Sequence, residues 1–450
     1  MTMSIFPATL TSLQKLILTY LLILLFGGMV LQLPFLGERS AEALDHFFTA
    51  TSALSTTGLT TVNVRDTYTF GGELVVLFLL QLGGIGYMSL AGTFLLDSDY
   101  GVKRQEEEDE MVEADYTIPD RTNLRTFVQH ILVYTVSCEV IGGIVLAYHF
   151  SASGVSEPIW RGFFTAISAF CTAGLHLFDT SLHSFAEDVV VNVTVSVLSL
   201  AGSFGFLLFS DVTQRLRGRK QRLSLSTKII CLVMAASVTV LSLALYPDMV
   251  ELNESMEVGT AAMVAVFTAV STVSTTGFST VSIAELGIIS KLLIVLFMFV
   301  GASPSGTGGG VKNTTLATVI AFVVAVIRRR DGVRLLGVRL SDFRTRLAIG
   351  LFIAYLGVVV VASILLLLDD QSLAGKGIFE VYSALGTVGL SLGATGQLPV
   401  FSTCLIMVLM MTGRLGVLSV LMATVGKSPQ SEETTEADDE PAGEDIDIEG

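Results

Sequence analysis

A thirteen-residue pattern rich in small and hydroxyl residues occurs four times in this chain. Its copies read FFTATSALSTTGL at residues 47–59, FFTAISAFCTAGL at 163–175, VFTAVSTVSTTGF at 266–278 and IFEVYSALGTVGL at 378–390. One Phe, one Ser, one Thr and one Gly are the same in every copy. These are Phe48, Phe164, Phe267 and Phe379; Ser52, Ser168, Ser271 and Ser383; Thr56, Thr172, Thr275 and Thr387; and Gly58, Gly174, Gly277 and Gly389. A motif that returns at a long and nearly constant period indicates a repeated structural unit.

The Thr-x-Gly near the end of each copy has the chemistry of a site for a dehydrated cation. Glycine allows backbone carbonyl groups to turn toward a common axis, and the threonine hydroxyl adds another oxygen. A helix that ends there also aims its partially negative C-terminus at the cation. One tripeptide says little, but four copies predict the segments of a potassium filter. These segments are Thr56, Thr57, Gly58 and Leu59; Thr172, Ala173, Gly174 and Leu175; Thr275, Thr276, Gly277 and Phe278; and Thr387, Val388, Gly389 and Leu390.

The four loops are not identical. The second has Cys171 and Ala173, and the fourth has Gly386 and Val388, where the other two have hydroxyl residues. Each has a single Gly where a stringent potassium filter ends in Gly-Tyr-Gly, so we expect looser discrimination against rubidium or sodium. The alternative is that the copies are four helix-breaking turns that bind no ion.

The composition is that of a membrane protein. The chain is 51% hydrophobic, with a mean hydropathy of +0.70. Long apolar stretches, each close to the roughly 20 residues that a helix needs to cross a bilayer, recur along it. They lie at about 13–33, 74–96, 127–150, 189–209, 229–246, 288–300, 347–368 and 400–425.

The elements that must position the loops follow a constant order of span, short re-entrant helix, loop and span. Within each motif Phe, Ser and Thr share one helical face, and we expect the helix to stop near the Thr because the following Gly permits unusual backbone angles. Non-helical backbone at membrane depth is tolerated only inside protein or beside water. The sequence therefore predicts an all-α integral membrane protein, with four tandem span–pore-helix–filter-loop–span repeats arranged pseudo-fourfold around one central pore. The predicted parts are repeats at 13–96, 122–212, 226–327 and 345–426, an acidic cytoplasmic linker at 97–121 and an acidic disordered cytoplasmic tail at 427–450.

Lys and Arg gather on one side of the predicted membrane. The linkers between repeats, with Lys427, carry 18 of them, whereas the segments that flank the motifs carry five. This bias predicts a multi-pass protein of the cell membrane with both termini in the cytoplasm and the motifs facing outward. The basic linkers 215–228 and 328–346 are candidate contacts for a protein partner or membrane lipid, although the positive-inside rule alone also explains them.

Other charged and reactive residues predict neither catalysis nor a cofactor. Residues 97–120 and 431–450 carry ten Asp or Glu each, which is typical of solvated chain. The five histidines and four cysteines lack metal-ligand or disulfide spacing, and no nucleotide fingerprint follows a strand. We expect no enzyme, no cofactor in this chain and no nucleic-acid partner, with K⁺ as the transported ion and Na⁺ as a second candidate.

Two features below the loops predict a gate. Glycines and a proline interrupt the second span of the third repeat at 301–315, which reads GASPSGTGGGVKNTT. We interpret this segment as an intramembrane gating loop rather than a static bend. Arg414 lies in an apolar stretch and should face a cavity, where it either opposes cation passage or only caps helix carbonyls. The gate residues are Gly301, Ser303, Pro304, Ser305, Gly306, Thr307, Gly308, Gly309, Gly310, Lys312 and Arg414.

Two further interpretations stay open. The glycines of the second spans at Gly83, Gly84, Gly202, Gly301 and Gly413 serve either close helix packing or a constriction. Glu139, an acid at membrane depth, could pair with a cation at a repeat or subunit boundary.

The loops STTGL, CTAGL, STTGF and GTVGL, the interrupted span and Arg414 resemble the Trk/Ktr/HKT superfamily of potassium transporters over residues 13–426. One span precedes the first loop, so the chain is more similar to KtrB than to TrkH members, which usually have two more N-terminal helices. The resemblance implies that Gly58, Gly174, Gly277 and Gly389 are filter glycines, 301–315 the gating loop and Arg414 a barrier. Pro304 departs from the family's usual run of small residues.

The resemblance also implies a homodimer controlled by a cytoplasmic ring of nucleotide-binding RCK subunits of the KtrA or TrkA type. Nucleotide would then act only through that partner. The predicted function is gated potassium uptake, with sodium dependence left open. The alternatives are the potassium-translocating subunit of an ATP-driven pump and a non-conducting membrane receptor.

Overall fold

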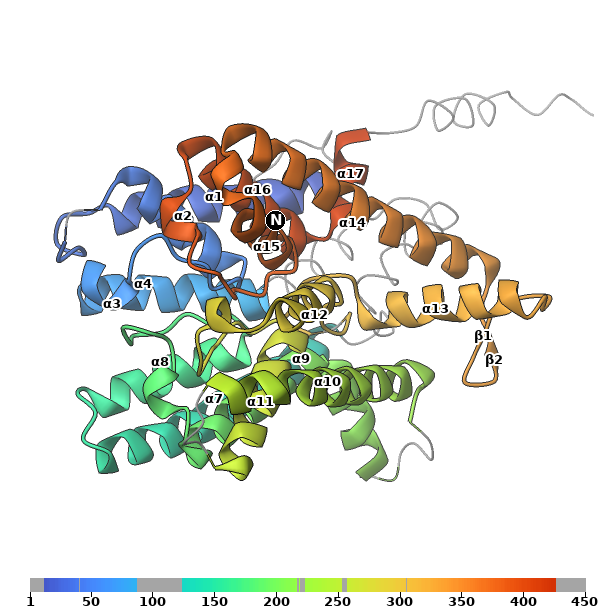
Figure 1. The fold of residues 1–450 in the computed structure, drawn as a ribbon, viewed down its shortest axis with the longest axis horizontal. Helices are drawn as coiled ribbons and strands as arrows, with labels where there is room; N and C mark the ends of the chain where they lie inside the picture. Colours follow the sequence, from blue (N-terminus) through green and yellow to red (C-terminus); the bar gives the residue numbers. More distant parts are fainter. Residues whose placement is uncertain are drawn as a thin grey trace, which may run out of the picture.

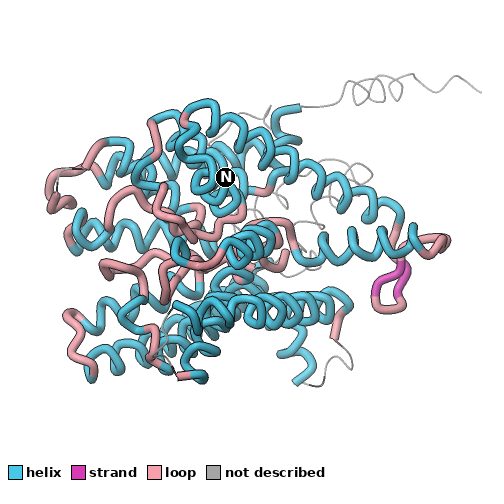
Figure 2. Tube along the Cα trace, viewed as in Figure 1, coloured by secondary structure: helices cyan, strands magenta, loops and turns pink. Residues whose placement is uncertain are grey.

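The computed structural model describes residues 12–39, 41–86, 124–216, 218, 223–252, 257–304 and 306–425. Within these ranges the chain is almost wholly helical (Figures 1 and 2), apart from one antiparallel hairpin of β1 (Arg334–Leu335) and β2 (Val338–Arg339). The acidic linker 97–121, the tail 427–450 and Ser305 of the predicted gate lie outside the described residues.

Each repeat contains a long first span, a shorter pore helix and a second span. The first spans are α1 (Ser12–Leu31), α7 (Leu124–Ala152), α10 (Leu225–Leu252) and α14 (Asp342–Asp369). The pore helices are α2 (Ala43–Leu54), α8 (Pro158–Phe170), α11 (Val258–Val273) and α15 (Ala374–Leu385). The second spans begin with α4 (Phe70–Gln81), α9 (Val189–Leu216), α12 (Ile288–Phe299) and α16 (Val400–Leu415). Short turns shape the connections: α3 (Val64–Thr67), η3 (His183–Phe185), η4 (Ile283–Glu285), η5 (Gln371–Leu373) and η6 (Thr395–Gln397).

Polar contacts tie the end of the first span to the start of the second span in the last three repeats. Asp369 accepts hydrogen bonds from the amide and hydroxyl of Ser402 at 3.1 and 2.6 Å. Asp248 accepts one from the amide of Gly287 at 2.6 Å, and His149 pairs with Asp188. In every repeat the pore helix packs against both spans, which therefore enclose it.

Each of the four second spans departs from a straight α-helix within the described residues. α4 passes into the π-helical turn η1 (Leu82–Gly86), and α9 contains Gly205 with φ 69° and ψ 175°. The segment 300–312 separates α12 from α13 (Asn313–Ile327), and α16 meets α17 (Val417–Val425) at 99° around Gly416. The stretches 189–209 and 400–425 are thus broken rather than straight, because glycines adopt backbone angles that end a helix.

A Gly-x-x-Gly pattern marks three of these interruptions, as GGIG at 83–86, GSFG at 202–205 and GRLG at 413–416. A Cβ on the first Gly of each would overlap the carbonyl oxygen of the last residue of that repeat's pore helix. The pairs are Gly83 with Leu54, Gly202 with Phe170, and Gly413 with Leu385. The first glycine therefore allows close packing against the pore helix. The bend of α9 and the break after α16 fall at the second glycine of the pattern, three residues later. Packing and bending thus belong to different glycines.

The helices suit a membrane. Among the described residues, five helices are long and apolar enough to cross a bilayer, or six if the bent pair α16–α17 is one span. Large apolar side chains such as Phe26, Ile141 and Ile353 stand exposed on the first spans, as expected for surfaces that face lipid rather than water. Figure 1 shows α13 and α14 projecting away from the other helices, with the β1–β2 hairpin at their far end. The chain is a multi-pass membrane protein.

Candidate functional site

Each pore helix ends with a threonine in the left-handed conformation. The φ angle is 52° at Thr56 and Thr172, 58° at Thr275 and 48° at Thr387. The amide of each bonds to the carbonyl three residues earlier at 3.1–3.2 Å, and the next amide to the carbonyl five residues earlier at 2.8–2.9 Å. This is a Schellman cap, in which the left-handed residue is usually Gly.

The helices stop at the threonine as predicted, but the physical reason differs. The left-handed residue is the threonine itself, and the motif glycine two residues later is a second position with positive φ. A β-branched residue in this region carries strain of ~1–3 kcal/mol, and such strain gathers at functional sites. All four loops carry it at the same place.

The four motif glycines meet in cyclic order. A Cβ on any of them would overlap a carbonyl oxygen of the next loop along the chain. The overlaps run from Gly58 to Ala173, from Gly174 to Thr276, from Gly277 to Val388, and from Gly389 back to Thr57. The last contact joins the fourth loop to the first, so the loops close a ring. A side chain at any of these positions would push two loops apart.

The other predicted filter residues are buried around this ring. The side chains ahead of each motif glycine are 0% exposed, and they are Thr56, Thr57, Thr172, Ala173, Thr275, Thr276, Thr387 and Val388. The apolar residues after the glycines are at most 2% exposed and pack into the hydrophobic clusters behind the loops. They are Leu59, Leu175, Phe278 and Leu390.

The motif serine braces the loop, a role that the sequence pattern marked but did not identify. Ser52 accepts a hydrogen bond from the amide of Gly58 at 3.0 Å, and Ser383 accepts one from Gly389 at 3.0 Å. Ser271 instead donates to the Phe278 carbonyl at 2.6 Å. The Ser168 hydroxyl, by contrast, is buried without a hydrogen-bond partner.

A second brace is present in two loops only. The hydroxyl pairs Ser55–Thr57 and Ser274–Thr276 lie 2.6 and 2.7 Å apart. The second and fourth loops have Cys171 with Ala173 and Gly386 with Val388 at these positions, so they cannot form it. The four loops share their backbone contacts, but only the first and third share this side-chain support.

The predicted gating loop lies against the four motif threonines. The Thr56 hydroxyl donates to the Thr307 carbonyl at 3.4 Å, and the hydroxyls of Thr172 and Thr307 lie 3.0 Å apart. The amide of Gly309 donates to the Thr387 hydroxyl at 2.9 Å. A Cβ on Gly308 would overlap the Thr275 hydroxyl. The structure therefore brings residues 307–309 directly under the ring.

The interruptions of the other repeats hold this loop. The amide of Ser303 bonds to the carbonyl of Ser203 at 3.3 Å, and that of Thr307 bonds to Gly202 at 3.1 Å. Arg414 is 4% exposed. Its guanidinium donates to the carbonyl of Thr307 and also to the carbonyls of Gly83 and Gly84, the latter at 3.2 Å. Arg414 thus links three repeats. It lies under the ring and also caps backbone carbonyls, so both features expected from the sequence occur together.

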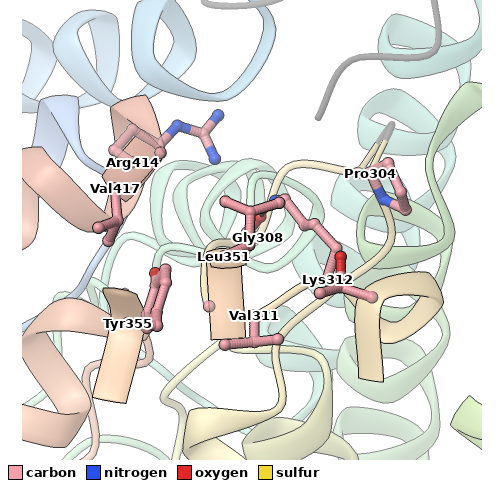
Figure 3. Close-up of a pocket in the computed structure, with 13 residues that line it drawn as sticks. Pro304, Gly308, Val311, Lys312, Leu351, Tyr355, Arg414 and Val417 are labelled. Carbon is pink, nitrogen blue, oxygen red and sulfur yellow. Dashed lines mark hydrogen bonds between the residues drawn. The ribbon is translucent and has the colours of Figure 1, made fainter. Parts of the chain in front are cut away.

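A small cavity adjoins this loop. Figure 3 shows Arg414 and Lys312 reaching it from different elements, with Pro304 at one side and Tyr355 and Val417 at the other. The Lys312 ammonium donates to the carbonyl of Gly308 at 2.9 Å. The side chains of Lys312 and Arg414 thus both bind backbone carbonyls of the predicted gating loop.

Two titratable residues lie close behind the second loop. Glu139 accepts hydrogen bonds from the Gln81 amide at 3.0 Å and lies 3.8 Å from the Cys171 thiol. Its observed partner across the boundary between repeats is thus a neutral amide, whereas the sequence suggested a cation. The second is His176, whose Nδ1 lies 2.9 Å from the Phe178 carbonyl oxygen.

Known proteins resemble this chain over nearly its full length. The family model described as "TrkH: Cation transport protein" matches residues 7–435. The potassium/sodium uptake protein NtpJ of Enterococcus hirae is 29% identical over 430 residues and covers 92% of each chain. Ktr system potassium uptake protein B of Bacillus subtilis is 28% identical over 428 residues, covering 93% of this chain and 94% of the relative.

A solved structure shares the fold. The crystal structure of the potassium transporter TrkH from Vibrio parahaemolyticus matches with a TM-score of 0.73 and 19% identity, covering 95% of this chain and 86% of that one.

Proposed function

Because the chain belongs to the TrkH family of cation transport proteins, we propose that it is the membrane subunit of a potassium uptake system. As a member of this family it is a transporter and not an enzyme. The prediction of a Trk/Ktr-type chain with a KtrB-type membrane subunit is confirmed by the family match and by relatives named as Ktr and NtpJ uptake proteins. Those names support K⁺ as the transported ion, and NtpJ supports Na⁺ as a second one.

The ring of motif glycines is the observation that carries this proposal. Four loops that meet in cyclic order, each at the end of a helix, support four repeats around one central pore. Backbone carbonyls of these loops would replace the water of a potassium ion, and the C-termini of the four pore helices would favour a cation at the ring. The filter segments are therefore 56–59, 172–175, 275–278 and 387–390.

The loop 301–315 is proposed as the gate. Residues 307–309 lie against the hydroxyls of the motif threonines, so an ion leaving the ring would meet them next. Arg414 would hold the loop in place and put positive charge near the ion path. Conduction then requires the loop to move away from the ring, and its backbone bonds to other repeats are the contacts that would break.

Control by a cytoplasmic partner is part of the proposal. The relatives named "Ktr system" proteins B and D indicate an uptake system with further components. We assign to this chain a homodimer with an RCK subunit, through which nucleotide would act. With the termini in the cytoplasm, the exposed arginines at 328–330, 334 and 339 around the β1–β2 hairpin would face that subunit or anionic lipid.

Potassium-dependent growth and rubidium uptake in cells that lack their own potassium uptake systems test this function. Wild type should restore both, and Gly277→Ser should abolish uptake or make it permissive for sodium, since a side chain there would overlap the fourth loop. Stimulation by a co-expressed RCK subunit would support the partner. Absence of uptake despite membrane insertion would favour a pump subunit or a receptor.

A further inference from the structure

Glu380 is a fully buried carboxylate that the filter chemistry does not use. It is 0% exposed and directly follows the motif phenylalanine on the pore helix α15. The other three pore helices have a threonine at this position, namely Thr49, Thr165 and Thr268. A charged group is seldom fully buried unless it is hydrogen-bonded, so its partners indicate what it does.

All of its hydrogen-bond partners belong to the segment that follows the fourth loop. Ser391 donates its hydroxyl to one carboxylate oxygen at 2.5 Å, and the Leu392 amide approaches the same oxygen at 3.3 Å. The Thr395 hydroxyl donates to the other oxygen at 2.9 Å. Ser391 comes directly after Leu390, the last residue of the fourth filter segment. The carboxylate therefore fixes the far end of that segment to its own pore helix.

The fourth loop lacks the hydroxyl pair of the first and third loops, and the Glu380 carboxylate gives it a different support. Its remaining side-chain brace is the Ser383 hydroxyl, which accepts from the Gly389 amide on the near side. With Ser391 held by Glu380, the segment is fixed on both sides of Leu390. Hydrogen bonds to a charged group are stronger than those between neutral groups, so one carboxylate can replace a hydroxyl pair.

We infer that Glu380 is a positioning residue for the fourth filter segment and that it contributes to the discrimination between K⁺ and Na⁺. The inference rests on the proposed function of the loops as a filter. By holding Ser391 and Thr395, the carboxylate sets the position of the carbonyls between Thr387 and Leu390.

The test is rubidium uptake into proteoliposomes of the full chain, with K⁺ and Na⁺ as competitors. Glu380→Gln keeps the size of the side chain but removes its charge and one acceptor. Ser391→Ala removes the closest donor, and Ser391→Thr restores a hydroxyl that the first loop already has at Thr60. The matched control is Thr268→Val, because the Thr268 hydroxyl at the equivalent position of the third pore helix is buried without a partner.

Both Glu380→Gln and Ser391→Ala should lower the K⁺/Na⁺ preference roughly tenfold, the scale of a lost hydrogen bond to a charged group. The change should lie in the apparent affinity for K⁺ more than in the maximal rate, and Ser391→Thr and Thr268→Val should match wild type. If Glu380→Gln does not fold, the two Ser391 variants decide the question alone.

Unchanged ion competition in folded Ser391→Ala and Glu380→Gln would overturn the inference. Gly277→Ser in the same assay separates this failure from that of the proposed function. If Gly277→Ser alters or abolishes uptake while the Glu380 and Ser391 variants behave as wild type, only the role of Glu380 is wrong. If Gly277→Ser also transports with wild-type preference, the filter itself is wrong, and the inference fails with it.

Discussion

The motif threonines and serines do different work at one loop. Thr56 holds the strained left-handed position that ends the pore helix, while Ser52 reaches forward to the amide of Gly58 at 3.0 Å. Removing the serine hydroxyl would leave a partly buried amide without its acceptor, which costs ~1 kcal/mol. The loop would then be free to relax, and its carbonyls would move.

Ser52→Ala and Ser383→Ala should each weaken potassium selectivity about fivefold, equivalent to ~1 kcal/mol. Competition of Na⁺ against rubidium uptake measures this. Ser168→Ala is the matched control, since that hydroxyl has no hydrogen-bond partner in the structure, and it should transport as wild type does. Equal effects of all three variants would contradict the bracing role.

Arg414 should act as a barrier through its position as well as its charge. Arg414→Ala removes the bonds to the carbonyls of Thr307, Gly83 and Gly84, so rubidium flux should rise severalfold. Arg414→Lys keeps the charge but cannot bind carbonyls of two elements with a planar fork, and flux should rise there too. If Arg414→Lys conducts as wild type does, charge alone forms the barrier; loss of membrane expression in Arg414→Ala would favour a purely structural role.

At the scale of elements, the interrupted second spans are the parts that meet below the ring. Within a continuous helix the backbone amides and carbonyls bond to one another. At a break some of them lose these partners and can form hydrogen bonds with neighbouring segments instead. The break of the third repeat bonds to that of the second through Ser303 and Thr307. The break of the fourth repeat supplies Arg414. The contacts below the ring are therefore made jointly by segments of the four second spans.

Shortening the loop within residues 304–310 should raise flux, because fewer residues would remain under the motif threonines. Rubidium efflux from proteoliposomes measures the change, with thermal stability of the purified protein as the control for folding. Flux at the wild-type level in a stable, shortened variant would show that these residues do not obstruct the path.

At the scale of the whole molecule, the ring makes the four repeats depend on one another. Every motif glycine is packed against the next loop, and the chain's first and last repeats meet at Gly389 and Thr57. Substitution of any one of them should therefore damage the same filter. Local differences between the loops would change the size of the effect but not its direction.

Alanine at Gly58, Gly174, Gly277 or Gly389 should in each case reduce rubidium uptake at least tenfold, since both the positive φ and the overlap with a carbonyl oppose a Cβ. Gly350→Ala is the matched control on α14, where a Cβ would meet nothing within 4 Å. A strong effect at only one of the four glycines would argue against a single shared pore.

Much of the architecture could be predicted from the sequence because it is written in local or periodic signals. The repeated motif, the apolar stretches, the glycine-rich interruption and the lone Arg414 each lie within a short window. Such signals predict where helices run, where a span cannot continue and which family the chain joins. The Gly-x-x-Gly pattern is an equally local signal for the breaks in the other second spans.

The tertiary structure decided whatever depends on residues far apart in the chain. Only the folded chain brings Gly389 to Thr57, Arg414 to Gly83, and Gln81 to Glu139. It also decided that threonine, not glycine, takes the left-handed position in the cap, since tertiary contacts can hold a strained residue that local propensity disfavours. Motif spacing can predict which residues form a filter. The order in which the loops meet depends on close packing between backbone segments that are far apart in the sequence.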